Sequence, residues 1–293
     1  VSTNRWRRAL KDGEVLLDGC RVAKGVSLRV GQELSFADDL LICLESAVLL
    51  PEAEPILEIL FEDENLLALN KPANCHTHPL SSSETGTLTN HLIAVFPELA
   101  GVGEFGPLQP GLLNRLDYAT SGVVLVARNN ATWLDLRGQF ERHLMRKEYL
   151  AEVAGELLHE TVIEKDLTHD RGDRRRMLVS PPAAPCRGLY SARTEVFPLQ
   201  FSQSQNLTQV RLVMYSGVMH QLRVHLADIG HPIFADPLYG YSLNPTYKEK
   251  DKEKELGVVT PGAGFHLHCL QMTLADGLVI GAPPPGWYKI KTV

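Results

Sequence analysis

Residues 111–128, GLLNRLDYATSGVVLVAR, place one carboxylate, that of Asp117, in a turn immediately before an apolar run. The run at 123–127 is too short for a free-standing helix and is rich in β-branched valine, so it predicts a buried strand. The Thr-Ser-Gly at 120–122 predicts the turn that leads into this strand. An Asp beside an Arg, on a loop held over a rigid strand, is typical of a positioned, ionised nucleophile. Asp117 is therefore a candidate catalytic residue, although an Arg-Leu-Asp tripeptide is also a common local salt bridge.

The rest of the chain predicts many strands and few helices. The predicted strands are residues 56–61, 66–70, 147–153, 194–201 and 207–215, and the predicted helices are residues 88–96, 131–144 and 221–228. In the second of these helices Trp133, Leu136 and Phe140 recur at helical spacing, which is more typical of a core face than of a base-stacking platform. Strands that alternate with few helices and show no βαβ regularity predict an α+β domain around a largely antiparallel, twisted sheet.

Charge is distributed unevenly along the chain. Residues 1–36 carry a net charge of +3 and residues 37–65 a net charge of −9, whereas the remainder is balanced. The overall charge of −6 therefore comes from an acidic connector. Any contact with nucleic acid must depend on local basic patches within an otherwise balanced surface.

The amino-terminal part predicts a small unit of its own. It reads as the end of a basic helix, then a hairpin at 14–22 with its turn at Asp18-Gly19, then a strand at 28–36 with a bend at Gly31. We expect this unit and the acidic connector to occupy residues 1–50, and one large domain to occupy residues 51–293.

Several kinds of site and location are disfavoured by what the sequence lacks. The sequence contains no run of about 18 apolar residues, so it predicts no membrane span. The cysteines are widely spaced, which favours reduced thiols in a cytoplasmic setting; they are Cys20, Cys43, Cys75, Cys186 and Cys269. The histidine and cysteine spacings do not match a zinc site, and no phosphate-binding loop or dinucleotide fingerprint occurs. We therefore expect no metal and no cofactor.

Four segments resemble, in order, motifs of the pseudouridine synthases of the RluA-like branch. They are 66–79 (LLALNKPANCHTHP), the stretch 111–128, 146–155 (RKEYLAEVAG) and 216–240 (SGVMHQLRVHLADIGHPIFADPLYG). The second resembles the signature His-Arg-Leu-Asp-x-x-Thr-Ser-Gly, and the fourth resembles the motif around His-Gln-Leu-Arg-Val-His. Members of this branch isomerise uridine in ribosomal and transfer RNA. The resemblance thus implies the pseudouridine synthase catalytic fold, with helices flanking a mixed sheet, and an enzyme that acts on a flipped-out base.

The resemblance also assigns three catalytic residues. Asp117 falls at the position of the essential aspartate. Tyr149 falls at the position of the active-site tyrosine, which implies a ring stacked on the target base and a hydroxyl for proton transfer near C5, whereas a half-buried tyrosine on a strand is otherwise ordinary core. Arg223 is expected to pair with Asp117 and hold its carboxylate ionised, whereas it would otherwise read as a surface arginine on a helix.

Five further residues are assigned to RNA binding. Arg115 is expected to help fill the gap that the flipped nucleotide leaves. Lys71 is expected to support the active site or to contact phosphate, although a plain charged strand end explains it nearly as well. His220 belongs to the fourth motif. Arg174 and Arg175 lie in an arginine cluster that predicts a phosphate-binding patch. A charge cluster that is only solvated explains them equally well.

The amino-terminal unit carries a resemblance of its own. Residues 13–19 resemble the Gly-x-Val-x-x-Asn/Asp-Gly strand of the S-four-like RNA-binding module, which is named from a ribosomal protein. A second RNA contact apart from the active site favours ribosomal RNA, of the large subunit, over transfer RNA as the structured RNA partner. We expect the protein to be a monomer.

Three departures from the family pattern leave an alternative open. Asn114 stands where the branch usually has His, Val218 where it usually has Arg, and Ala235 where the Gly-Asp pair usually begins. The loss of a basic residue at 218 bears on affinity and substrate choice more than on chemistry. The alternatives are a catalytically weak RNA-binding or ribosome-assembly factor that keeps the fold, and a synthase directed to transfer RNA. A metal-dependent RNA hydrolase is disfavoured because paired carboxylates are lacking.

Overall fold

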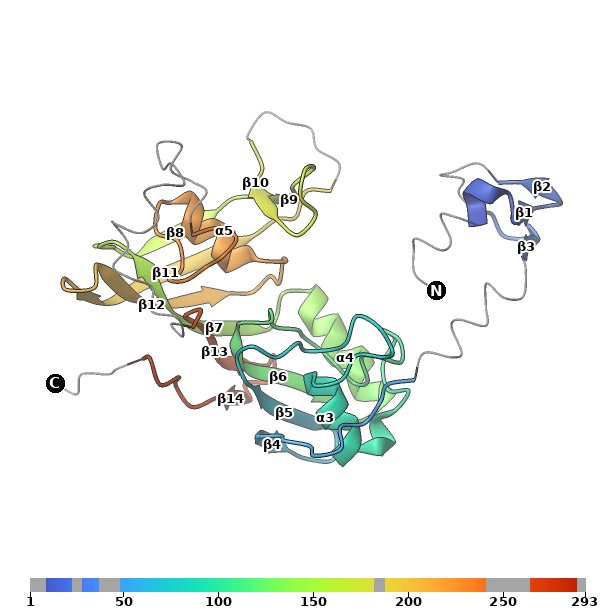
Figure 1. The fold of residues 1–293 in the computed structure, drawn as a ribbon, viewed down its shortest axis with the longest axis horizontal. Coiled ribbons are helices and arrows are strands. Elements are labelled where there is room, and N and C mark those ends of the chain that lie inside the picture. The colour runs from blue at the N-terminus through green and yellow to red at the C-terminus, as the bar shows by residue number, and fades with distance from the viewer. Residues whose placement is uncertain (1–8, 23–27, 37–47, 182–187, 241–263, 289–293) are drawn as a thin grey trace.

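A nine-stranded sheet organises the computed structural model, which describes residues 9–22, 28–36, 48–181, 188–240 and 264–288. The strands follow the order β4-β5-β6-β13-β7-β12-β11-β8, and β14 pairs with β13 (Figure 1). Their bounds are Ile59–Glu62 (β4), Leu66–Lys71 (β5), Ser121–Ala127 (β6), Arg146–Ala154 (β7), Thr161–Glu164 (β8), Arg193–Ser202 (β11), Leu207–Met214 (β12), Leu267–Thr273 (β13) and Val279–Gly281 (β14). Among these described strands only the pair β6–β13 is parallel.

Three α-helices of the described residues flank this sheet. They are Leu88–Val95 (α3), Asn130–Glu141 (α4) and Gln221–Asp228 (α5), and a short 3-10 helix, η1 (Pro97–Leu99), follows α3. In Figure 1, α3 and α4 lie beside β4, β5 and β6, whereas α5 lies beside β8 and β11. The α+β class with a largely antiparallel sheet is therefore confirmed. Within the described part of the chain, no helix combines the length and the apolar character that crossing a membrane requires.

The helix predicted at 131–144 is present as α4 but ends at Glu141. Its start is fixed by Asn129, whose side chain accepts a hydrogen bond from the backbone N–H of Thr132 at 2.9 Å. Trp133, Leu136 and Phe140 are all buried in the main core, as their spacing predicted. The predicted choice of core over stacking platform is thus supported for this helix.

The amino-terminal unit forms a separate three-stranded sheet of order β2-β1-β3. Its strands are Val15–Leu17 (β1), Cys20–Arg21 (β2) and Leu34–Phe36 (β3). The predicted turn is confirmed, because Asp18 and Gly19 both have positive φ, of 50° and 74°, as a two-residue hairpin of this twist requires. The strand predicted at 28–36 is shorter than expected, since β3 pairs with only three residues of β1. Most of the basic helix predicted before residue 9 lies outside the described residues.

Strand β6 contains the apolar run of the opening stretch, and it is buried from Gly122 to its end. Residues 123–127 are 0% exposed, which confirms the buried strand. The structure explains why a glycine precedes this run. Gly122 has φ of 114°, and a Cβ there would lie 2.1 Å from the carbonyl oxygen of Cys269 on β13. The parallel neighbour therefore approaches β6 where only glycine fits. Ser121 and Gly122 are already part of β6, so the predicted turn is shorter than 120–122.

A third sheet, of two strands, lies near α5. It pairs Leu167–His169 (β9) with Met177–Val179 (β10), and the arginine-rich loop 170–176 joins them. Met177, Val224 and Tyr239 share a buried cluster. This cluster fixes α5 and the segment after it against β10, and that contact positions part of the site described below.

Acid should weaken the fold through His268 on β13. This side chain is 2% exposed, its Nδ1 lies 2.8 Å from Ser121 Oγ, and burial lowers its pKa from 6.5 to about 4. In the unfolded chain His268 takes up a proton as the pH falls below 6.5, whereas in the folded chain it does so only near pH 4. The free energy of unfolding therefore decreases as the pH falls from 6.5 to about 4, and this group does not affect it above pH 6.5. We expect a loss of up to about 3 kcal/mol from this group.

Urea unfolding at pH 7 and at pH 4.5 measures this effect. The substitution His268→Gln should reduce the difference between the two pH values, whereas His159→Gln, at an exposed position, should not. An unchanged pH dependence in His268→Gln would show that other groups cause the acid sensitivity.

Candidate active site

A cavity of about 1020 Å³ lies at the middle of the large sheet, where β7, β12 and β13 contribute to its lining. The loop before β6, strand β7, the β9–β10 hairpin and the start of α5 all contribute to its wall. Predicted site residues from three separate segments of the sequence meet there, among them Asp117, Tyr149, His220 and Arg223. A cavity of this size lies at the upper end of the range for small-molecule pockets, so it has room for a nucleotide.

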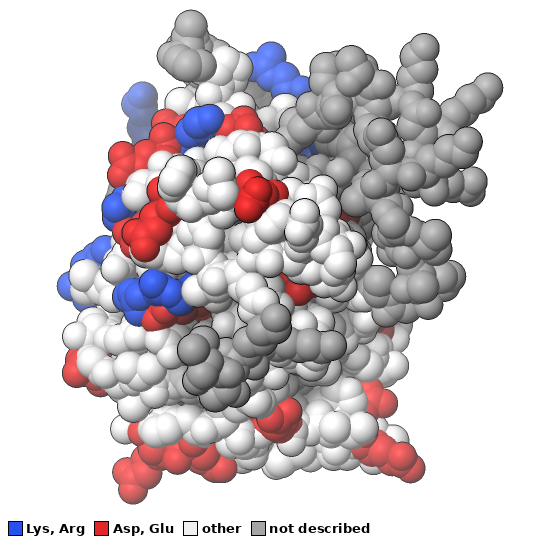
Figure 2. Space-filling view, turned by 90° about the vertical axis from the view of Figure 1, so that its left-hand side faces the viewer, with Lys and Arg blue, Asp and Glu red and all other residues white. Residues whose placement is uncertain are grey.

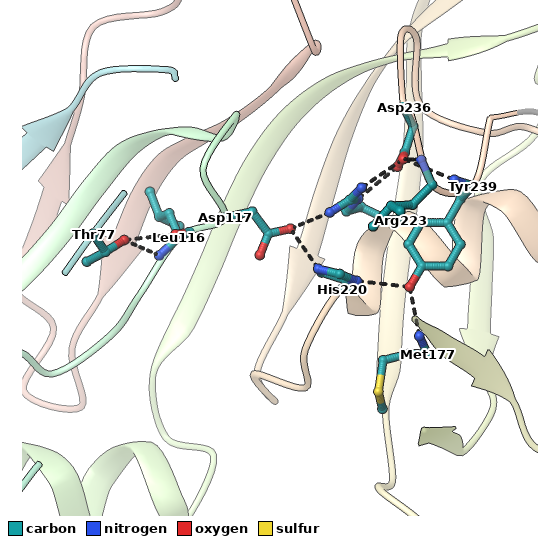
Figure 3. A network of polar contacts seen from close by, with 9 residues as sticks. Thr77, Leu116, Asp117, Met177, His220, Arg223, Asp236 and Tyr239 are labelled. Atoms are coloured by element: carbon teal, nitrogen blue, oxygen red, sulfur yellow. Dashed lines mark hydrogen bonds and ion pairs between the residues drawn. The ribbon is translucent and has the colours of Figure 1, made fainter. Parts of the chain in front are cut away.

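The loop that carries Asp117 is fixed on both sides of the carboxylate. Thr77 Oγ1 donates to the carbonyl of Leu116 at 2.8 Å and accepts from the Leu116 N–H at 3.2 Å (Figure 3). After the carboxylate, the N–H of Thr120 donates to the Asp117 carbonyl at 3.1 Å. The Asp117 side chain is 32% exposed, so it faces the cavity from a backbone that is held in place.

Asn114, one of the departures from the family pattern, has a clear structural role. Its Nδ2 donates to the carbonyl of Val123 at 3.2 Å, and its Oδ1 accepts from the N–H of Leu125 at 2.8 Å. These two bonds pin the loop against β6. The departure therefore preserves the path of the chain that leads to Asp117.

Lys71 is buried beneath this loop. It is 0% exposed, and its ammonium donates to the carbonyls of Pro72 (2.8 Å), Cys75 (2.7 Å) and Tyr118 (3.2 Å). Burial lowers its pKa to about 8, against the fields of Cys75 and Asp117. This burial rules out the predicted direct contact of Lys71 with RNA and leaves the alternative, support of the loop that carries Asp117.

Arg223 links Asp117 to a second carboxylate. Its Nη1 lies 2.9 Å from Asp117 Oδ2, and its Nε and Nη2 each lie 2.8 Å from an oxygen of Asp236 (Figure 3). The ring centroids of Tyr239 and Phe265 lie 5.2 and 5.1 Å from the guanidinium carbon. Burial lowers the pKa of Arg223, but the bonds to Asp236 and the field of Asp117 outweigh it and raise the pKa. The cavity thus holds one fixed positive charge next to Asp117.

Asp236 and Tyr239 are site residues that the sequence reasoning missed. The Asp236 side chain is 0% exposed, and its Oδ1 also accepts from the N–H groups of Leu238 (2.8 Å) and Tyr239 (3.1 Å). Both residues lie in the ADPLYG end of the fourth motif, which was the available signal. Ala235, just before them, has φ of 57°. This conformation is costly for alanine and explains why glycine suits that position.

Tyr149 forms part of the cavity floor from β7. It is 5% exposed and stands opposite Cys269 of β13. Burial raises the pKa of Tyr149 well above its usual value, and Cys269 adds to the shift. The hydroxyl is therefore protonated at neutral pH, so it can donate a hydrogen bond.

The three predicted RNA-binding arginines are all exposed. Arg115 is exposed and lines the cavity. Arg174 and Arg175 are exposed in the loop between β9 and β10, and Arg175 forms an ion pair with Asp173 at 2.8 Å. Their contact with RNA remains a prediction.

The charges are unevenly placed on the face shown in Figure 2. Basic and acidic side chains of the described residues are interspersed in its upper left part, whereas the charged side chains along its lower edge are acidic. Within the described ranges, no three or more His, Cys, Asp or Glu side chains are grouped so that they could hold a metal ion. The predicted catalytic residues and His220 offer a carboxylate, an arginine, a phenol and an imidazole. Other ionisable side chains, among them Arg115, Lys147 and Glu141, also line the cavity.

Several known proteins resemble this chain. Residues 65–228 match the model of a family described as RNA pseudouridylate synthase. A Bacillus subtilis protein described as the uncharacterized RNA pseudouridine synthase YlyB is 32% identical over 244 residues, which cover 81% of this chain and 76% of the relative. The ribosomal large subunit pseudouridine synthase D of Nitrosomonas europaea is 35% identical over 190 residues, covering 64% of this chain and 52% of the relative. The solved structure of human RNA pseudouridylate synthase domain containing 1 has a similar fold, with a TM-score of 0.61 at 22% identity over 80% of this chain and 86% of that one.

Proposed function

Because this chain belongs to the RNA pseudouridylate synthase family, we propose that it isomerises uridine in ribosomal RNA with Asp117 as the catalytic carboxylate. The observation that carries the proposal is the ion pair between Asp117 and Arg223, 2.9 Å apart in the wall of the large cavity. Arg223 is itself anchored by Asp236, so the pair is held rather than formed by chance at a surface.

The reaction needs no cofactor to balance. The bond between N1 of uracil and C1′ of ribose breaks, the base turns, and a bond forms between C5 and C1′. C5 then loses its proton and N1 gains one, so the product is an isomer of the substrate. An ionised Asp117 serves this sequence either by attacking the sugar or base or by removing a sugar proton, and both routes use the carboxylate form.

Tyr149 and Arg115 complete the proposed machinery. The Tyr149 ring offers a face for the flipped base, and its hydroxyl is available for proton transfer near C5. The exposed Arg115, two residues before Asp117, is placed to stack where the flipped nucleotide leaves the RNA. The joint retention of Asp117, Tyr149 and Arg223 argues against a non-catalytic RNA-binding factor.

Ribosomal RNA is the proposed substrate for two reasons. Relatives at 30–35% identity are named ribosomal large subunit pseudouridine synthase D. The small sheet β2-β1-β3 also offers a second, separate surface for RNA. Transfer RNA is the alternative substrate.

Tritium release tests the proposed substrate. Isomerisation frees the hydrogen at C5, so transcripts made with [5-³H]uridine release tritium to water in proportion to turnover. We expect release from a large-subunit ribosomal transcript and none from bulk transfer RNA transcripts. Release from transfer RNA alone would contradict the choice of substrate, and release from neither RNA would favour the RNA-binding factor.

Substitution of Tyr118 should weaken RNA binding. This side chain follows Asp117, is 49% exposed, lines the cavity, and lies 4.7 Å from the ring of His76. An exposed aromatic pair at this position offers a stacking surface for an unpaired base, worth roughly 1–3 kcal/mol. We expect Tyr118→Ala to raise the Kd for substrate RNA about tenfold with little change in the single-turnover rate.

Filter binding and single-turnover kinetics measure the two quantities separately. Tyr215→Ala is the matched control, because Tyr215 is similarly exposed but lies outside the cavity wall. A slower chemical step with unchanged Kd in Tyr118→Ala would show that this ring positions the reacting base instead.

A further inference from the structure

The hydroxyl of Tyr239 lies between two groups that together define its hydrogen bonds. Tyr239 is 3% exposed, and its oxygen accepts from the N–H of Met177, the first residue of β10, at 2.8 Å. The same oxygen lies 2.9 Å from Nδ1 of His220 (Figure 3). A backbone amide only donates. The phenolic hydrogen is therefore available to His220, and the described part of the chain offers it no other acceptor.

This arrangement fixes the tautomer of His220. If Nδ1 accepts from Tyr239, the hydrogen of the neutral ring is on Nε2. Nε2 is the nitrogen that faces Asp117, 3.7 Å from Oδ2. Burial raises the pKa of Tyr239, so its hydroxyl stays protonated and able to donate.

The backbone conformation at His220 indicates that the direction of this ring is functional. His220 precedes α5 and adopts φ of 56° and ψ of 18°, in the left-handed region. A residue other than glycine adopts this conformation at an energetic cost, and such residues cluster at functional sites. An energetically unfavourable backbone conformation at His220 thus directs its imidazole into the cavity.

Burial keeps the His220 ring neutral at pH 7, although two carboxylates lie near it. Burial lowers the pKa of His220; Asp117 and Asp236 oppose this shift and Arg223 adds to it. The neutral ring therefore presents one acceptor, at Nδ1, and one donor, at Nε2.

We propose that Tyr239 holds His220 in the Nε2–H tautomer and that His220 donates a hydrogen bond from Nε2 to Asp117. Tyr239 and His220 are then positioning residues. The inference rests on the proposed function of Asp117. Arg223 and His220 both face Oδ2 of that carboxylate, so Oδ1 receives neither donor. Oδ1 is the oxygen that this arrangement turns toward the substrate. The 3.7 Å separation is longer than a hydrogen bond, and catalytic contacts of this kind shorten when substrate binds.

Nitrogen NMR of the imidazole rings tests the tautomer without any RNA. We expect protein labelled with ¹⁵N-histidine to show, for His220 at pH 7, a protonated Nε2 and an unprotonated Nδ1. The resonances are assigned by their loss in His220→Gln. Tyr239→Phe should remove this preference. A protonated Nδ1 in the unaltered protein would overturn the proposal, whatever the protein does to RNA.

Single-turnover kinetics at saturating RNA test the positioning role. Tyr239→Phe should slow the chemical step about tenfold and leave the Kd for RNA within about twofold, since one hydrogen bond to a reacting group is weakened. His220→Ala should slow it further, and His220→Gln should recover much of the rate, because its amide again offers one acceptor and one donor. A raised Kd with an unchanged rate would assign His220 to RNA binding and overturn the proposal.

Two controls separate this proposal from other causes. Tyr215→Phe and His159→Ala remove the same chemical groups from exposed positions outside the cavity wall, and both should retain the rate of the unaltered protein. If the unaltered protein turned over no RNA, the proposed function would fail, while the NMR result would still decide the tautomer.

Discussion

Asp117→Asn should reduce turnover by at least about 10⁴-fold, because loss of a nucleophile or essential base commonly has an effect of this size. The amide keeps the shape of the side chain and still accepts a hydrogen bond from Arg223, which lies 2.9 Å from Oδ2. It loses the negative charge that either chemical route requires. Binding of RNA should change by no more than about threefold, since the cavity wall is otherwise unaltered.

Tritium release under single-turnover conditions gives the rate, and filter binding gives the Kd. Asp135→Asn, on the exposed face of α4, is the matched control and should keep full activity. A fall of less than about tenfold in Asp117→Asn would be too small for a residue that takes part in bond breaking.

Asp236→Asn should cause the largest loss of stability among the site variants. The carboxylate is 0% exposed and makes two bonds of 2.8 Å to Arg223. The amide removes the charge and turns a donor toward a guanidinium that has no acceptor to offer. Because removal of one partner from a buried ion pair leaves an uncompensated charge, we expect the free energy of unfolding to fall by about 3 kcal/mol.

Asp228→Asn is a close control for this variant, because it removes a carboxylate from α5 that is paired with Lys165. That pair is 28% and 46% exposed, so its loss should lower the free energy of unfolding by less than about 1 kcal/mol. Urea unfolding measures both variants. Equal effects of the two substitutions would show that the pair between Arg223 and Asp236 contributes no more than a surface ion pair.

Local pattern was sufficient to predict most of the elements. The helix predicted at 221–228 coincides with α5, since its end at Gly230 is a strong stop signal. The apolar run before Arg128 was correctly predicted as a buried strand because β-branched residues in a short run fit few other environments. The ion pair of Asp117 with Arg223 followed from the resemblance, since local pattern does not show which residues meet across 106 positions.

Contacts between distant segments set the limit of prediction. Lys71 is a lysine at a strand end, where charge alone favours exposure, yet three carbonyls from two loops bury its ammonium. Asp236 and Tyr239 lie in a loop without periodicity, and their roles depend on Arg223, His220 and Met177, which only the tertiary fold brings near. Side-chain direction within irregular segments is the information that pattern does not contain.

Pseudouridine mapping of total RNA tests the central claim most directly. Cells that lack this protein are complemented either with the intact chain or with Asp117→Asn, and the uridines modified in each are compared. The account predicts one or more sites in large-subunit ribosomal RNA that the intact chain restores and Asp117→Asn does not. Restoration of the same sites by Asp117→Asn, or no site lost in the deficient cells, would contradict it.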